Sequence, residues 1–157
     1  MTPSTTQKPV EPTMFGRIIV LIKNAYFHPS DPCGKGQSLC NVYVQLEVGT
    51  KTWETAAIKS ERPEWNDEYN VDFDVKFNDS VNFVLWNQVK KTRWENRLKR
   101  LGSFSVNLQD LIEKGNSGKP VTYGLDGSSS YVEVVITWTN KYDDGYFMVY
   151  YLNLILI

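Results

Sequence analysis

The feature that most constrains the fold is a series of short apolar segments, about ten residues apart and separated by turn residues. The segment at 68–75, EYNVDFDV, alternates apolar and polar side chains over its whole length. Such a period of two is typical of a β-strand with one buried and one solvated face. The runs follow one another with only one short helical segment among them, so we predict an all-β fold, an antiparallel β-sandwich.

We predict eight strands and one short helix, which lies between the sixth and seventh strands. Gly49 and Thr50 separate two strand-like runs and indicate a hairpin. Asn107 is suited to cap the start of the helix and Gly115 to end it. The predicted strands are 16–26, 41–48, 51–58, 68–75, 80–86, 101–106, 119–125 and 130–138.

The chain divides into three parts. Residues 1–14 are rich in Pro, Thr and Ser and are predicted to be disordered. Residues 15–139 form one domain. Residues 140–157 end in an uncharged run, YFMVYYLNLILI, that is too short to span a bilayer. We leave its structure open between an extra strand and an anchor.

One segment concentrates the positive charge. Residues 88–100 hold six basic residues and one acidic residue, Glu95, for a net +5, whereas the other 11 basic and 17 acidic residues give −6. A basic segment on an acidic body attracts an anionic partner. For Trp94, two interpretations stay open: it binds that partner, or it packs with Leu98 and Leu101 on one face of a short amphipathic helix.

The cysteines and the N-terminus bear on the compartment. Cys33 and Cys40 are close enough in sequence for a bridge, but two free thiols in a reducing cytosol are the preferred interpretation. The N-terminus lacks the apolar stretch of a signal peptide, and no run is long enough for a transmembrane span. We therefore predict a cytoplasmic protein whose membrane contact, if any, is peripheral.

Nothing in the sequence indicates catalysis. His28 is the only histidine, and a zinc site built from His28, Cys33 and Cys40 would lack a fourth ligand. The carboxylates at 67, 68, 72 and 74 fall mostly on the solvated face of a predicted strand. We predict no enzyme, no cofactor and no nucleic-acid partner, since the acidic remainder of the chain would repel phosphates.

Several segments together resemble the C2 domain family. The first strand carries the spacing Gly16, Ile18, Val20, Ile22 and Ala25. The other matching segments are NVYVQLEV at 41–48, KT at 51–52 followed by RPEWNDEYNVDF at 62–73, and RLGSFSVNLQDLIEKG at 100–115. The resemblance covers roughly residues 15–139. It implies an eight-stranded sandwich with three loops at one end, in the type II strand order, because no strand is predicted before residue 16.

The resemblance also implies where calcium would bind. C2 domains often hold Ca²⁺ with carboxylates of the first and third loops, and Ca²⁺ needs six to eight oxygen ligands. The corresponding positions here are Asn41, Asn87 and Val89, and the nearby acids are only Asp31 and Glu95. The resemblance therefore implies a calcium-independent C2 domain with no metal.

The predicted function is docking of a non-catalytic module to anionic phospholipids, phosphatidylserine or phosphoinositides, through the third loop. The alternative is a calcium-independent C2 domain that binds a protein partner in scaffolding or signalling. The residues expected to bind lipid or partner are Lys90, Lys91, Arg93, Trp94, Arg97, Lys99 and Arg100.

Overall fold

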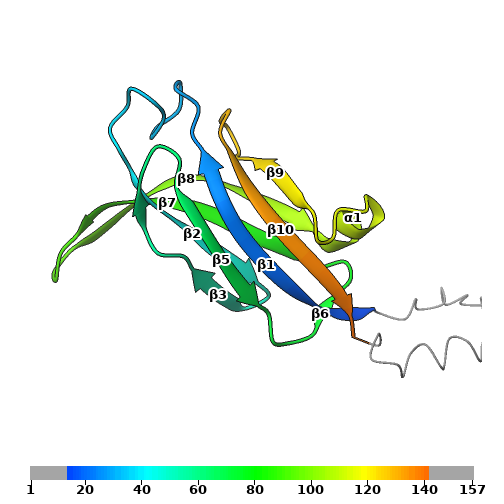
Figure 1. The fold of residues 1–157 in the computed structure, drawn as a ribbon. Coiled ribbons are helices and arrows are strands. Elements are labelled where there is room, and N and C mark those ends of the chain that lie inside the picture. The colour runs from blue at the N-terminus through cyan, green and yellow to red at the C-terminus, as the bar shows by residue number, and fades with distance from the viewer. Residues whose placement is uncertain (1–13, 142–157) are drawn as a thin grey trace, which may run out of the picture.

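The computed structural model describes residues 14–141 as a sandwich of two antiparallel sheets (Figure 1). The first sheet has the strand order β5-β1-β10-β9, with β6 also paired to β1; the second has the order β3-β2-β7-β8, with β4 also paired to β2. The elements are β1 (Phe15–Tyr26), β2 (Asn41–Val48), β3 (Lys51–Glu54), β4 (Ile58–Lys59), β5 (Glu64–Asn70), β6 (Val75–Lys76), β7 (Ser80–Lys91), β8 (Asn96–Asn107), α1 (Leu108–Glu113), β9 (Pro120–Gly124) and β10 (Tyr131–Asn140).

The predicted sandwich is confirmed, but the strand count of eight is wrong because the structure has ten strands within the described residues. The run 51–58 divides into β3 and β4, and Thr55 between them turns its hydroxyl to the β2 backbone, where it accepts from Val44 N at 2.9 Å. The run 68–75 divides as well: β5 ends at Asn70 and β6 covers two residues. The alternating burial predicted there persists nonetheless, since Val71 and Val75 are buried.

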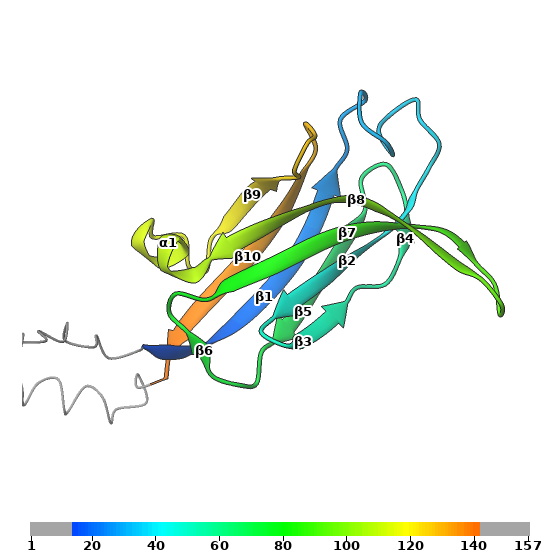
Figure 2. The same cartoon turned by 180° about the vertical axis from the view of Figure 1, so that it is seen from behind.

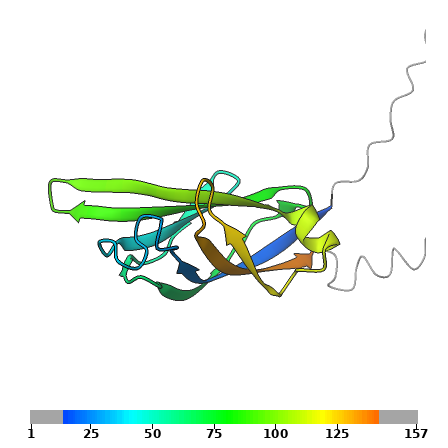
Figure 3. The ribbon, with the colours of Figure 1, turned by 90° about the horizontal axis from the view of Figure 1, so that it is seen from above.

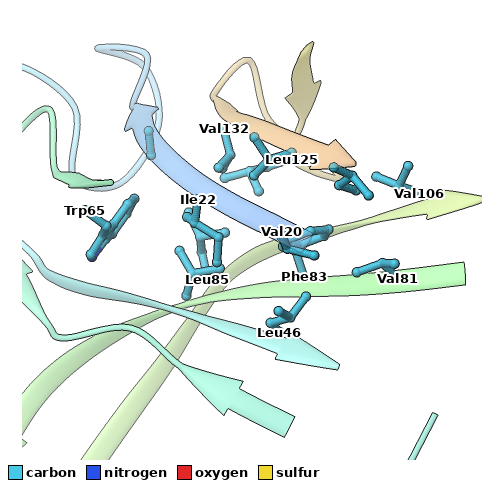
Figure 4. Close-up of a cluster of buried hydrophobic side chains, with 14 of the residues drawn as sticks. Val20, Ile22, Leu46, Trp65, Val81, Phe83, Leu85, Val106, Leu125 and Val132 are labelled. Atoms are coloured by element: carbon cyan, nitrogen blue, oxygen red, sulfur yellow. The ribbon is translucent and has the colours of Figure 1, made fainter. Parts of the chain in front are cut away.

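The core fills the space between the two sheets (Figure 4). Phe83 of β7 is fully buried and stacks on Phe104 of β8 with ring centroids 4.6 Å apart. Trp65 is buried as well and donates its indole N–H to the carbonyl of Ala56 at 2.9 Å. The inward-facing residues of both sheets therefore form one continuous apolar layer.

The local signals for the hairpin and the helix are confirmed. Gly49 and Thr50 connect β2 to β3, and Gly49 has a φ of +60°, which glycine adopts without strain. Asn107 caps α1, accepting a hydrogen bond from Asp110 N at 3.1 Å. Gly115 follows the helix with a φ of +70°. Within residues 14–141, no helix is long and apolar enough to cross a bilayer.

The two ends of the sandwich differ. The connections 27–40, 60–63 and 125–130 lie at one end, whereas α1, β6 and both ends of the described chain lie toward the other (Figures 1 and 2). The predicted disordered segment 1–14 and the extension 140–157 fall outside the described residues, apart from Met14, Asn140 and Lys141. Because residues before Met14 are not described, the type II strand order stays a prediction.

The predicted free thiols are wrong, because Cys33 and Cys40 form a disulfide with a Cα–Cα distance of 5.3 Å. The connection from β1 to β2 folds back through successive turns, in which Asp31 N bonds to His28 O and Gly34 N to Asp31 O. Both cysteines are thereby buried against the sandwich. Because the two thiols are not free, they do not support the prediction of a reducing compartment.

Candidate functional site

The sequence predicted a loop for the basic segment, and this prediction is wrong. The segment is the protruding part of a long β-hairpin. Strands β7 and β8 pair from Ser80↔Asn107 out to Lys91↔Asn96, so only residues 92–95 form the turn. Strand β2 pairs with β7 only as far as Asn87. Residues 88–100, here called the ribbon, therefore project from the sandwich as a two-stranded arm (Figures 1 and 3).

Backbone hydrogen bonds, rather than a buried face, extend the strands into the ribbon. The ladder continues outward from the core pair Leu85↔Gly102. Register shifts next to Trp86 and Lys90 mark β-bulges, which increase twist and redirect a strand. At the tip, Thr92 N donates to Glu95 O at 2.7 Å and closes the turn.

Three of the predicted cations share one face of the ribbon. Arg97 and Lys99 are two positions apart on β8, so they lie on the same face. Lys90 is opposite Arg97 in the ladder and therefore lies on this face too. Asn87, which is opposite Lys99, shares the face. Leu98 and Arg100 belong to the other face.

Ion pairs engage three of the basic side chains that the structure describes in the ribbon. Glu95 contacts Lys90 Nζ at 3.2 Å and Arg97 Nε at 2.6 Å. Arg100 contacts Asp126 at 3.0 Å. Lys99 makes no ion pair within the described part of the chain.

Asp126 anchors the base of the ribbon to the neighbouring connection. The backbone N–H of Ser103 donates to it at 2.7 Å and, together with the Arg100 guanidinium, lowers the pKa of the Asp126 carboxyl. In the ladder, Lys91 lies opposite Asn96. The ribbon therefore keeps a positive excess that its single acidic residue, Glu95, does not neutralise.

Trp94 stands at the tip and is 88% exposed. The interpretation in which it packs with Leu98 and Leu101 on a helix is wrong, because the segment is an extended hairpin and the indole faces the solvent. The Arg93 guanidinium lies 5.2 Å from the centre of the indole ring. This arrangement presents an aromatic ring and a cation together to the solvent.

The sequence reasoning missed two further exposed apolar side chains on the ribbon. Val89 is 57% exposed and Leu98 is 41% exposed. With Trp94, they make up half of the six large apolar side chains that are exposed in the described part of the chain. In the sequence, they stand out only as apolar residues within a cationic segment. They follow no regular period, because neither face of the ribbon is buried.

Two oxygen-bearing side chains near the expected calcium positions, those of Asn87 and Asp31, accept hydrogen bonds within the protein. The side-chain oxygen of Asn87 accepts a hydrogen bond from Asn41 N at 3.0 Å. Val89 lies in the bulge of β7. The Asp31 carboxylate accepts from Ser129 N at 2.9 Å and from Ser130 Oγ at 2.7 Å. Across residues 14–141, no group of three His, Cys, Asp or Glu side chains gathers as a metal site would need.

The acidic residues near β5 have their own cationic neighbours. Asp72 lies 3.7 Å from Lys51 Nζ, and Asp74 lies 2.7 Å from Lys141 Nζ. The cations of the ribbon are thus not folded against this acidic face. Instead, they are presented on an arm that extends past the body of the sandwich (Figure 3).

Comparison with known families gives one match. Residues 16–125 match the C2 domain family. No curated protein sequence matches the chain.

Solved structures with a similar fold include the following three. A structure of the two C2 domains of Extended-Synaptotagmin 2 has 17% identity and a TM-score of 0.62, with 89% of this chain and 46% of that chain covered, so this chain spans about half of its length. A C2 domain-containing protein from a putative elicitor-responsive gene has 14% identity and a TM-score of 0.65, with 88% and 99% covered. Human GIVD cytosolic phospholipase A2 has 12% identity and a TM-score of 0.61, with 85% and 17% covered. At these identities the likeness concerns the fold alone.

Proposed function

The chain belongs to the C2 domain family, whose members are generally non-catalytic modules that bind membranes or proteins, and from this premise we propose that it docks to anionic phospholipids without calcium. The observation that carries the proposal is the projecting ribbon with Trp94 almost fully exposed at its tip. Phosphatidylserine and phosphoinositides have the head groups that such a surface would bind. Docking of this kind suits the cytoplasmic leaflet, which carries anionic lipids, and would be peripheral.

The ribbon combines the two interactions that hold peripheral proteins at a membrane. Each Lys or Arg near an anionic surface contributes about 1 kcal/mol. Indole rings favour the interfacial zone of a bilayer, where Trp94 would insert. Val89 and Leu98 would add apolar contact behind it.

Calcium independence is proposed because the expected ligand positions, Asn41, Asn87 and Val89, carry no carboxylate. Asn87 and Asp31 also accept hydrogen bonds from the protein, which take up part of their capacity as ligands. Glu95 is paired to Lys90 and Arg97. The cations of the ribbon would also repel a divalent cation at short range.

The test is cosedimentation with vesicles of phosphatidylcholine alone and of phosphatidylcholine mixed with phosphatidylserine. We expect binding to the anionic vesicles only, weakened by salt and unchanged by a calcium chelator. The substitutions Lys90→Glu, Lys91→Glu and Arg93→Glu together should abolish it. A matched triple, Lys76→Glu, Lys114→Glu and Lys119→Glu, carries the same charge change at the far end of the sandwich and should leave binding unchanged.

Two results would overturn the proposal. One is equal partitioning to neutral and anionic vesicles, which would remove the electrostatic basis. The other is an equal loss of binding in both triple variants, since overall charge would then explain the effect. A loss of binding upon chelation would overturn calcium independence alone.

A second candidate is docking to a protein partner, and the open edges of the ribbon favour it. Beyond Asn87, β7 has no neighbour on the side of β2, and β8 is the last strand of its sheet within the described residues. Such edges can pair with an extended segment of another chain. Arg and Trp, both present at the tip, are favoured at the centres of protein interfaces. A ribbon that binds no vesicle of either composition would leave this candidate as the better one.

A further inference from the structure

Thr92 is the only residue of the ribbon that carries a hydroxyl, and it lies at the tip among the cations. Lys90 and Lys91 precede it and Arg93 follows it. Its side chain is exposed, and its Oγ accepts a hydrogen bond from Glu95 N at 2.9 Å. The hydroxyl thus helps to close the turn and faces the solvent at the same time.

We propose that Thr92 is a phosphorylation site for a protein kinase that selects basic residues, and that the phosphate releases the ribbon from anionic membranes. The release rests on the docking function proposed above, whereas the modification itself does not. Kinases commonly recognise their substrates by the charge pattern around the acceptor. The tip offers that pattern with basic side chains on both sides of the hydroxyl.

The sequence alone would favour a different acceptor, Ser103. It has Arg100 three residues before it and Lys99 four before it, which is also a basic pattern. The structure argues against Ser103, because it lies within β8 opposite Val84. Its N–H and its carbonyl both bond to Asp126, at 2.7 and 3.1 Å, and its hydroxyl accepts from Arg100.

The two sites differ in what a kinase would have to disrupt. Access to Ser103 requires β8 to leave a sheet in which its Phe104, which is half-buried, stacks on the fully buried Phe83. Access to Thr92 requires only the tip of a two-stranded ribbon to open, and such ribbons are marginally stable by themselves. Thr92 is therefore the acceptor that a kinase can reach while the sandwich stays folded.

The reaction is an ordinary phosphoryl transfer from ATP. A bond forms between Thr92 Oγ and the γ-phosphorus, and the bond from that phosphorus to the bridging oxygen of the β-phosphate breaks. The hydroxyl proton passes to the base of the kinase, and ADP leaves with the bridging oxygen.

The phosphate changes the charge of the ribbon where it matters for docking. It adds about −1.5 to −2 charges at neutral pH, so the net charge of the ribbon falls from +5 to roughly +3. The phosphate also competes with lipid head groups for the neighbouring cations. We expect binding to anionic vesicles to weaken about 10- to 30-fold.

In the experiment, the full chain is treated with ATP and a serine/threonine kinase that selects basic residues. The phosphorylated residues are then mapped by mass spectrometry. A synthetic peptide of residues 88–104, in which the hydroxyls of Thr92 and Ser103 are both accessible, confirms that the kinase is active. We expect phosphate on Thr92 of the folded chain, the same in Ser103→Ala, and none at the ribbon in Thr92→Ala. The products are then sedimented with vesicles of phosphatidylcholine and phosphatidylserine.

Each result decides one part of the proposal. Phosphate on Ser103 rather than Thr92 of the folded chain, or on neither while the peptide is modified, overturns the assignment of the site. Unchanged vesicle binding after modification of Thr92 overturns the release. If the untreated chain binds no anionic vesicles, the docking function fails and the release fails with it. Treated Thr92→Ala should keep the binding of the untreated parent, which shows that the kinase acts through this residue.

Discussion

Replacing Glu95 with glutamine should strengthen membrane docking, although it removes two ion pairs from the ribbon. Glu95 is the only acidic residue among residues 88–100, and it contacts both Lys90 and Arg97. Its side chain is 42% exposed and those of its partners are 49% and 63% exposed. Exposed pairs of this kind contribute only about 0.2–1 kcal/mol each to stability. The sandwich should therefore remain folded in Glu95→Gln.

The expected gain in docking follows from the charge of the ribbon. The substitution changes its net charge from +5 to +6 and releases two cations for lipid phosphates. One unit of charge near an anionic surface is worth about 1 kcal/mol, which is roughly a fivefold increase in affinity. The gain should shrink as the ionic strength rises, because salt screens exposed charges.

The assay is vesicle cosedimentation over a lipid titration at two salt concentrations. Glu113→Gln is the matched control, because Glu113 ends α1 at the far end of the sandwich and accepts a hydrogen bond from Gln109 of the same helix. It changes the charge of the whole chain by the same amount and should leave binding unchanged. Unaltered or weaker binding of Glu95→Gln, or an equal gain in the control, would refute the reasoning.

Three further predictions concern the fold. Replacing Cys33 and Cys40 together with alanine should lower the free energy of unfolding by about 2.5 kcal/mol, the closure entropy of so short a loop, in urea titrations; an unchanged midpoint would contradict this. Phe83→Ala should cost about 3–5 kcal/mol in the same assay because its ring is fully buried, and a loss below about 1 kcal/mol would show that the core recloses around it. Burial raises the pKa of Tyr69 to about 12, so its contribution to stability is complete below about pH 10 and is lost as the pH rises toward 12. Tyr69→Phe should therefore reduce the alkaline loss of stability followed by circular dichroism, and an identical pH profile would exclude Tyr69 as its source.

The parts of the fold that could be predicted are those in which local sequence and burial agree. Apolar residues of β1 and β2 fill the core, so their pattern is visible in the sequence. For the strand 68–75, the sequence predicts Tyr69, Val71, Phe73 and Val75 on one inward face. Val71 and Val75 are buried and the other two are half-buried, but the extent of the strand is wrong. Phe73 leaves the ladder to stack against Trp53 of the opposite sheet, 6.4 Å away, and this contact is invisible to a periodic pattern.

The composition of the candidate site could be predicted from the sequence, but the predicted shape, a loop, is wrong. The basic residues and Trp94 were identified because they are dense in a short segment. Their strands were missed because both faces of the ribbon meet water, so no apolar alternation marks them. The disulfide was missed for a related reason, because the turns that bring Cys33 to Cys40 depend on the folded connection between β1 and β2.

The sequence by itself determined the sandwich, its helix and the position of an unusually basic segment. These follow from local patterns of burial, turn residues and charge, which act over a few neighbours along the chain. The tertiary structure decided that this segment is an arm and not a loop, because the ladder of β7 and β8 extends past the last residue that β2 can pair. It also decided that Thr92 lies at an exposed tip, whereas Ser103 lies within a paired strand and bonds to Asp126, a partner distant in sequence.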